Sequence, residues 1–160
     1  MKRYWHVLLS AYVPLILWIG VIFFLSSTAG SMLETSKFIG PLLRFLFPAA
    51  PEETLRIYHG YVRKFAHFAE YAILAFWAIR AFATSSAGFL RNSRYWLAIL
   101  LVVLIAALDE YHQSFEPSRT ASVYDVLLDC IGGSAMAFVF WLFTGRRSHV
   151  SGDIERRSSE

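Results

Sequence analysis

The chain has 160 residues, of which 56% are hydrophobic and 17% are charged. Soluble domains are nearer half apolar and about a quarter charged, so this composition favours a membrane protein of one domain. The net charge of +3 comes largely from arginines at the loops and the tail. No basic patch interleaved with stacking aromatics accompanies it, which argues against nucleic acid as a partner. A single cysteine, Cys130, excludes an intrachain disulfide.

An apolar N-terminal stretch predicts the first membrane span, at about residues 5–25. Its apolar part, Val7–Leu25, is about 19 residues long, which suits a span and exceeds the apolar region of a secretory signal. Pro14 is compatible with this prediction because membrane helices tolerate a proline kink. We therefore expect an uncleaved first helix.

A connection of about 35 residues follows the first span. Its centre, SKFIGPLLRFLF, mixes Lys37 and Arg44 with leucines and phenylalanines, which is typical of a segment that lies in the membrane interface. Next comes PEET at Pro51–Thr54, with proline at a helix start and acids in a first turn. We expect a helix to begin near Glu52 and to continue into the second span.

Three more stretches complete an all-α, polytopic membrane four-helix bundle, with spans at about 61–82, 95–111 and 123–143. The bundle forms one domain, 1–146, with the interfacial segment between helices 1 and 2. Residues 147–160 are polar and serine-rich, which predicts a flexible cytoplasmic tail. With four spans, one side of the membrane holds nine of the 15 Lys and Arg and the other side six. The positive-inside rule then places both termini in the cytoplasm.

Two polar clusters lie at the ends of these spans. The second span begins with the first cluster, KFAHFAEY (Lys64–Tyr71). The other cluster, DEYHQSFEPSRTASVYDVLLD (Asp109–Asp129), ends the third span and begins the fourth. An ionisable side chain costs roughly 2.5–3.5 kcal/mol at mid-bilayer on insertion scales, so such groups mark functional sites. In an antiparallel four-helix bundle both clusters fall on the same side, here the extracytoplasmic one, and we expect a single polar site.

Helical spacing selects the candidate residues, because positions three, four and seven apart share a helix face. The catalytic candidates are His67, Glu70, Asp109, Glu110 and Asp125. The ligand-binding candidates are Lys64, Tyr71, Gln113, Arg119, Ser122 and Asp129.

Carboxylates outnumber fixed cations among these candidates. Two like charges 4 Å apart repel by roughly 4 kcal/mol at an effective dielectric of 20. The surplus must be relieved by protons on carboxylates, by protonated histidines or by a bound divalent cation. For such a cation the candidate ligands are Asp109, Glu110, Asp125 and Asp129. A purely architectural network of ion pairs is the alternative.

The two clusters resemble motifs of the VanZ-like family. The matching patterns are K-x-x-H-F-x-E-Y at Lys64–Tyr71 and D-E-x-x-Q-x-x-x-P-x-R-x-x-S-x-x-D-x-x-x-D-x-x-G from Asp109 to Gly132. Ser26 and Ser27 fit a weaker first motif, whereas Ser118 and Asp129 replace residues that are often glycine and asparagine in the family. The resemblance implies a bacterial inner-membrane protein. The founding member is linked to low-level resistance to the glycopeptide teicoplanin, without an agreed activity.

These observations favour a protein that acts on an anionic cell-envelope lipid or a lipid-linked precursor at the extracytoplasmic face. Catalysis is left open. One alternative is a phospho- or glycolipid hydrolase or transferase that uses the clustered residues. Another is a proton-coupled transporter of a lipid or small molecule, for which four helices would require a homodimer. A third is a scaffold of the envelope machinery.

Overall fold

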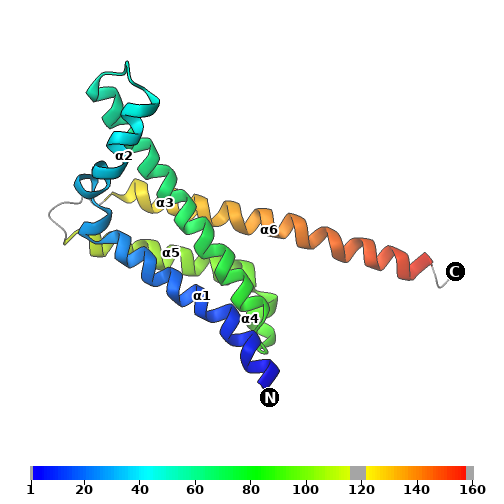
Figure 1. Cartoon of the computed structure of the whole chain (residues 1–160). Helices are drawn as coiled ribbons and strands as arrows, with labels where there is room; N and C mark the ends of the chain where they lie inside the picture. The colour runs from blue at the N-terminus through cyan, green and yellow to red at the C-terminus, as the bar shows by residue number, and fades with distance from the viewer. Residues whose placement is uncertain (1, 116–121, 158–160) are drawn as a thin grey trace.

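The chain is all-α in the part that the structure describes, a computed structural model covering residues 2–115 and 122–157. The elements follow one another with these bounds (Figure 1): α1 Lys2–Ser26, the 3₁₀ turn η1 Thr28–Gly30, α2 Met32–Leu46, α3 Glu52–Ala83, α4 Gly88–Asn92, α5 Arg94–Gln113 and α6 Val123–Arg157. The predicted all-α fold class is confirmed. The helix start expected near Glu52 is also confirmed, and α3 continues without a break through the second predicted span.

Three helical segments are long and apolar enough to cross a membrane: Leu9–Ser26, Arg94–Gln113 and Val123–Thr144. They coincide with the first, third and fourth predicted spans. The second predicted span lies within α3, which is not among these segments. Arg63, Lys64, Glu70 and Arg80 within that stretch make α3 less apolar than the others. The chain therefore has the helices of a membrane protein, and a fourth span in α3 stays a prediction.

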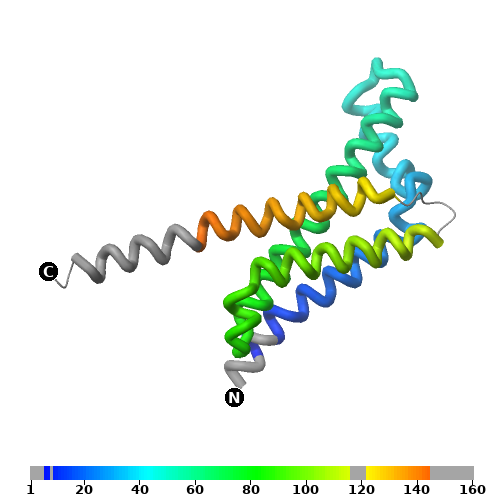
Figure 2. Tube along the Cα trace, turned by 180° about the vertical axis from the view of Figure 1, so that it is seen from behind, coloured from blue at the N-terminus to red at the C-terminus, as the bar shows by residue number. Residues whose placement is uncertain are grey.

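Helix α3 is the centre of the fold, because it packs against α1, α2, α5 and α6. Figures 1 and 2 show α3 crossing the other long helices, while α2 folds back along its N-terminal part. The core contains many alanines, which let helix backbones approach closely. Its buried members are Leu15, Ile22, Tyr71, Leu74, Ala75, Ala78, Ile79, Ala81, Ala98, Val102, Ile105, Ala106 and Ala137.

The connection between α1 and α3 is largely helical. Ser31 caps α2 by accepting a hydrogen bond from the Glu34 backbone N–H at 3.3 Å. Leu43 is buried against the rest of the fold, whereas Phe38 and Phe45 are 79% and 82% exposed. An amphipathic helix with large exposed aromatics agrees with the interfacial segment expected here, although its place in a membrane interface stays a prediction.

Helix α6 extends beyond the predicted fourth span, since its bounds reach Arg157. It thus enters the segment 147–160 for which the sequence predicts a flexible tail. Flexibility of that segment stays a prediction. Before this extension, the Thr144 hydroxyl lies 2.6 Å from the Tyr95 hydroxyl, which joins α6 to the start of α5. The two helices therefore run antiparallel over the length of α5.

Candidate functional site

Two successive glycines bring α6 against its neighbours. Gly132 lies against the main chain of Phe68 on α3, and a Cβ built there would be 3.1 Å from the Phe68 carbonyl carbon. A Cβ on Gly133 would be 2.7 Å from a methyl group of Val102 on α5. A side chain at either position would force these neighbouring atoms to shift. Because Asp129 precedes Gly132 by about one helical turn, this close packing sets its position between α3 and α5.

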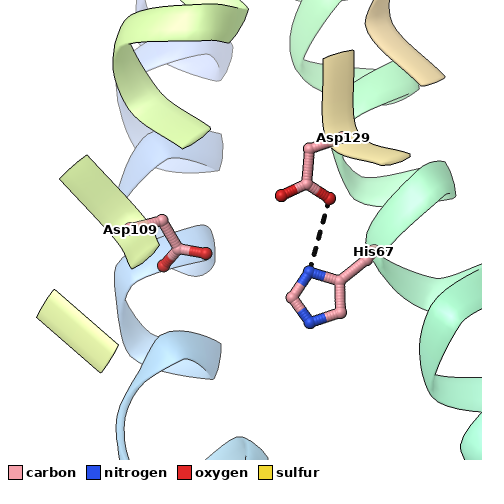
Figure 3. Close-up of side chains that lie close together, drawn as sticks. All are labelled: His67, Asp109 and Asp129. Carbon is pink, nitrogen blue, oxygen red and sulfur yellow. Dashed lines mark ion pairs between the residues drawn. The ribbon is translucent and has the colours of Figure 1, made fainter. Parts of the chain in front are cut away.

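Three ionisable side chains converge at this point from three helices. They are His67 of α3, Asp109 of α5 and Asp129 of α6, which point toward one another in Figure 3. One nitrogen or oxygen from each lies within 4.8 Å of those from the other two. His67, Asp109 and Asp129 are 8%, 3% and 1% exposed, so the group is buried. The sequence-based expectation that the two clusters meet in space agrees with this geometry.

The polar atoms of this group are incompletely satisfied. The His67 Nδ1 to Asp129 Oδ1 distance is 3.4 Å, that of an ion pair, but the contact lacks hydrogen-bond geometry. Within residues 2–115 and 122–157, neither oxygen of Asp129 has a hydrogen-bond partner, and the same holds for Oδ1 of Asp109. A buried polar group without a partner costs about 1–3 kcal/mol. The group therefore favours binding of a cation or retention of protons.

Gln113 orients one member of the group. Its side-chain Nε2 donates a hydrogen bond to Asp109 Oδ2 at 3.0 Å, and Gln113 itself is 1% exposed. This bond fixes the carboxylate so that its other oxygen is available to the group. Tyr71, which is fully buried, places its hydroxyl beside Asp109 as well. Both residues were predicted as ligand-binding, and both lie at the site.

A pocket of about 220 Å³ opens beside the group, between α1, η1, α2, α3 and α5. Its polar lining residues are Ser26, Thr35, His59, Arg63, His67, Glu70, Asp109 and Gln113. The other lining residues are small or apolar, namely Ile22, Leu25, Gly30, Ile39, Val62 and Ala66. His59 and Glu70 are 11 positions apart on α3, so the pocket follows roughly 16 Å of that helix.

The structure does not bring Lys64 to this pocket. Lys64 is exposed, and the half-buried Arg63 lines the pocket instead. Arg63, His67 and Glu70 follow one another at four- and three-residue intervals and share one face of α3, whereas Lys64 is turned by about 100° from Arg63. Among the described residues that line the pocket, the permanently charged cation is therefore Arg63, one position before the predicted Lys64.

Glu110 and Ser122 join the end of α5 to the start of α6. The Glu110 carboxylate accepts a hydrogen bond from the Ser122 backbone N–H. The Ser122 hydroxyl in turn accepts one from the Tyr124 backbone N–H at 3.2 Å and caps α6. Through these hydrogen bonds, the two residues stabilise the start of α6 beside the site. Asp125 is half-buried one turn before Asp129, and Arg119 lies outside the described residues.

Two contacts near the pocket were not predicted. The His59 ring nitrogen Nε2 lies 3.1 Å from the Thr35 hydroxyl, joining α2 to α3. The Ser26 hydroxyl lies 3.2 Å from His112 Nδ1, joining α1 to α5. The sequence contains a pattern that could have identified His59, because His59, Arg63 and His67 recur every four residues and so share one helix face. Thr35 had no such signal, since its contact depends on how α2 folds back.

A comparison with family models agrees with the residues at this site. The model described as VanZ/LLP1 matches residues 11–144, which include both polar clusters. The chain belongs to the VanZ/LLP1 family. The resemblance inferred from the two motifs is thereby confirmed. No curated protein and no solved structure gives a significant match.

Membership of the VanZ/LLP1 family and the three apolar helices together identify a membrane protein of the VanZ type. The matched region begins within α1 and ends within α6. All three converging residues and the whole pocket therefore fall inside the family's region of the chain.

Proposed function

We propose that this VanZ/LLP1 protein binds an anionic cell-envelope lipid, or a lipid-linked envelope precursor, in the pocket along α3. In this proposal α3 is a fourth span and the pocket lies at the extracytoplasmic face of a bacterial inner membrane, with both termini in the cytoplasm. The distribution of Lys and Arg supports that orientation. A contribution to glycopeptide resistance would follow if the bound precursor were the glycopeptide's target.

The observation that supports this function most is a half-buried arginine in a mostly apolar pocket. Arg63 lines the pocket together with Ile22, Leu25, Ile39 and Val62. A guanidinium presents donors in a planar fork that fits phosphate or carboxylate oxygens. An apolar wall with one such group suits an amphiphile with an anionic head.

The size of the pocket limits what it can hold. Pockets that enclose a drug-sized molecule are about 300–1,000 Å³, and this one is about 220 Å³. A headgroup therefore fits, while the acyl or prenyl chain must remain outside. Leu25 and Val62 line the pocket and are 38% and 40% exposed, so they give such a chain an apolar surface.

A second candidate function is hydrolysis or transfer at the same headgroup. His67, Glu70 and Asp109 line the pocket with Arg63, so a bound headgroup would lie near groups that can act as general acid or base. Proton-coupled transport and a scaffold role are also compatible with a buried polar site in a membrane protein. A transporter would move lipid without altering it, and a scaffold would tolerate neutral substitutions in the pocket.

Lipid binding by a matched pair of variants tests the proposal. The full chain in detergent is titrated with a polyprenyl phosphate, and phosphatidylethanolamine serves as the zwitterionic control lipid; bound lipid is measured by native mass spectrometry. Loss of a hydrogen bond to a charged group costs about 1.5–3 kcal/mol, so Arg63→Gln should weaken binding by about 10- to 100-fold. Lys64→Gln removes the same charge one residue away and should leave binding unchanged.

The result that would overturn the proposal is equal loss of binding in the two variants, or equal affinity for both lipids. Mass analysis of the lipid after incubation addresses the second candidate function. A changed lipid mass that disappears in Glu70→Gln would support catalysis. An unchanged mass together with Arg63-dependent binding would support a binding function alone.

A further inference from the structure

We propose that His67, Asp109 and Asp129 bind a divalent first-row transition-metal ion, with Mn²⁺ and Zn²⁺ as the probes. The three residues come from α3, α5 and α6 and converge (Figure 3), and two of them, His67 and Asp109, also line the pocket. The proposal does not depend on lipid binding, and it narrows the ligand set expected from the sequence. His67 joins Asp109 and Asp129 as a ligand, while Glu110 and Asp125 are left out.

The types of ligand atom select the class of metal. One imidazole with two carboxylates is a mixed nitrogen and oxygen set, and imidazole favours transition metals over Mg²⁺ and Ca²⁺, which prefer oxygen. Three protein ligands leave coordination positions open, as in catalytic rather than structural zinc sites. The set therefore fits an ion that can accept a further ligand.

The distances agree with such a site. Two atoms bound to one ion at about 2.1 Å in tetrahedral geometry lie roughly 3.4 Å apart. His67 Nδ1 and Asp129 Oδ1 are 3.4 Å apart. The ligand atoms of all three residues lie within 4.8 Å of one another, so shifts of about 1 Å would close the set around an ion.

The burial of the two carboxylates without enough hydrogen-bond partners is a second argument for a bound metal ion, independent of the distances. Asp129 is 1% exposed, and neither of its oxygens has a hydrogen-bond partner among the residues that the structure describes. No ion pair in the same part of the chain joins Asp109 or Asp129 to a lysine or arginine. A bound dication would supply the missing charge and occupy these oxygens.

Asp109 is held by a neighbouring side chain in the way that metal ligands usually are. Such ligands are usually held by a second residue that fixes their orientation. Gln113 holds Asp109 Oδ2 at 3.0 Å, and Oδ1 has no hydrogen-bond partner among the residues that the structure describes. His67 and Asp109 also line the pocket, so the open coordination positions would face any anionic headgroup bound there.

Metal content is the direct test. The full chain is purified in detergent, stripped with a chelator and reloaded with MnCl₂, ZnCl₂ or MgCl₂. We expect about one Mn²⁺ or Zn²⁺ per chain and a higher Tm in their presence, because an ion that binds only the folded state stabilises it. Mg²⁺ should be retained at least tenfold more weakly. Wild-type protein without bound Mn²⁺ or Zn²⁺ would overturn the proposal.

A matched pair of variants locates the ion. Asp129→Asn should abolish the retained metal and the rise in Tm. Asp125→Asn makes the same change one turn earlier on α6, outside the three converging residues, and should retain both. Equal loss of metal in the two variants would contradict the assigned ligands.

Arg119→Gln tests whether a natural counter-charge takes the place of the ion. This variant should retain the metal as the wild type does. If it alone gained metal, Arg119 would be the natural counter-charge of the carboxylates, and the proposed site would be refuted.

Spectroscopy of the wild-type protein provides a test that does not require any variant to fold. Pulsed electron paramagnetic resonance of bound Mn²⁺ should show coupling to one imidazole nitrogen, and absence of nitrogen coupling would refute ligation by His67. Arg63→Gln separates this proposal from lipid binding. That variant should lose lipid and keep metal, so failure of one proposal leaves the other measurable.

Discussion

Gly132 on α6 lies against the main chain of Phe68 on α3, and this close approach aligns the two helices at the level of the site. His67 directly precedes Phe68, and Asp129 precedes Gly132 by about one turn of α6. The same approach of backbones therefore brings the imidazole and the carboxylate to 3.4 Å. A larger residue at this crossing would push α3 and α6 apart, whereas glycine lets their backbones approach closely.

Gly132→Ala should destabilise the protein. An added Cβ would be 3.1 Å from the Phe68 carbonyl carbon and closer still to its oxygen, and backbone cannot move aside as a side chain can. Overpacking of this kind typically costs about 1–3 kcal/mol. Thermal unfolding of the detergent-solubilised chain, followed by circular dichroism, should show a lower Tm.

Gly20→Ala is the matched control, since a Cβ built at Gly20 in α1 meets no described atom within 4 Å beyond its own chain neighbours and the adjoining backbone of α1. Alanine is favoured over glycine in a helix interior by up to about 1 kcal/mol, so the Tm should stay the same or rise. A fall as large as that of Gly132→Ala would show that glycine loss, rather than the contact with Phe68, is responsible.

The sequence alone was sufficient to predict the apolar helices and to predict that the two polar clusters lie close together. Helices α1, α5 and α6 follow from long apolar runs, and the acids at Glu52 and Glu53 mark the start of α3. Antiparallel spans connected by a short loop place both clusters at one end, and His67, Asp109 and Asp129 indeed converge there.

The choice between Arg63 and Lys64 could not be predicted from spacing. Arg63 lies four positions before His67 and Lys64 three positions before it, and both intervals are compatible with one helix face. Packing of α1 and α2 against α3 decides which residue faces the pocket. The contact between Thr35 and His59 likewise depends on the path of α2, which is a tertiary property that no local pattern contains.

Trp18→Phe should loosen the contact between α1 and α3. The indole Nε1 donates a hydrogen bond to the Glu70 backbone carbonyl at 2.9 Å, and phenylalanine has no donor. A lost hydrogen bond of this kind costs about 0.5–1.5 kcal/mol. Chemical unfolding in mixed micelles should show the difference, and Trp96→Phe should leave stability unchanged because Trp96 is 77% exposed. Equal effects would contradict a specific role of Trp18.

The ion pair between Arg44 and Glu52 should contribute little to stability, although its geometry is good. Two hydrogen bonds join the side chains, at 2.9 and 3.1 Å, and Arg44 lowers the pKa of Glu52. Both side chains are more than 60% exposed, where water and salt screen the charges. Arg44→Gln should leave the Tm within error at low and at high salt. A clear loss at low salt alone would contradict this expectation.

Stability should fall on acidification through a step that depends on His59. Burial, followed by the positive charge of Arg63, lowers the pKa of His59. The folded state thus favours the neutral imidazole, while the unfolded chain binds its proton near pH 6.5. The stabilising contribution is complete above about pH 6.5 and is lost as the pH falls from there through the lower folded pKa.

The hydrogen bond to Thr35 indicates how the neutral ring is held. The Thr35 hydroxyl donates to the Ser31 carbonyl at 2.8 Å, so its oxygen accepts from His59 Nε2 at 3.1 Å. A glutamine at position 59 can donate the same bond without titrating. The Tm of His59→Gln should therefore fall less between pH 7.5 and pH 5 than that of the wild type. Identical pH profiles would show that protonation of other groups, and not of His59, causes the acid sensitivity.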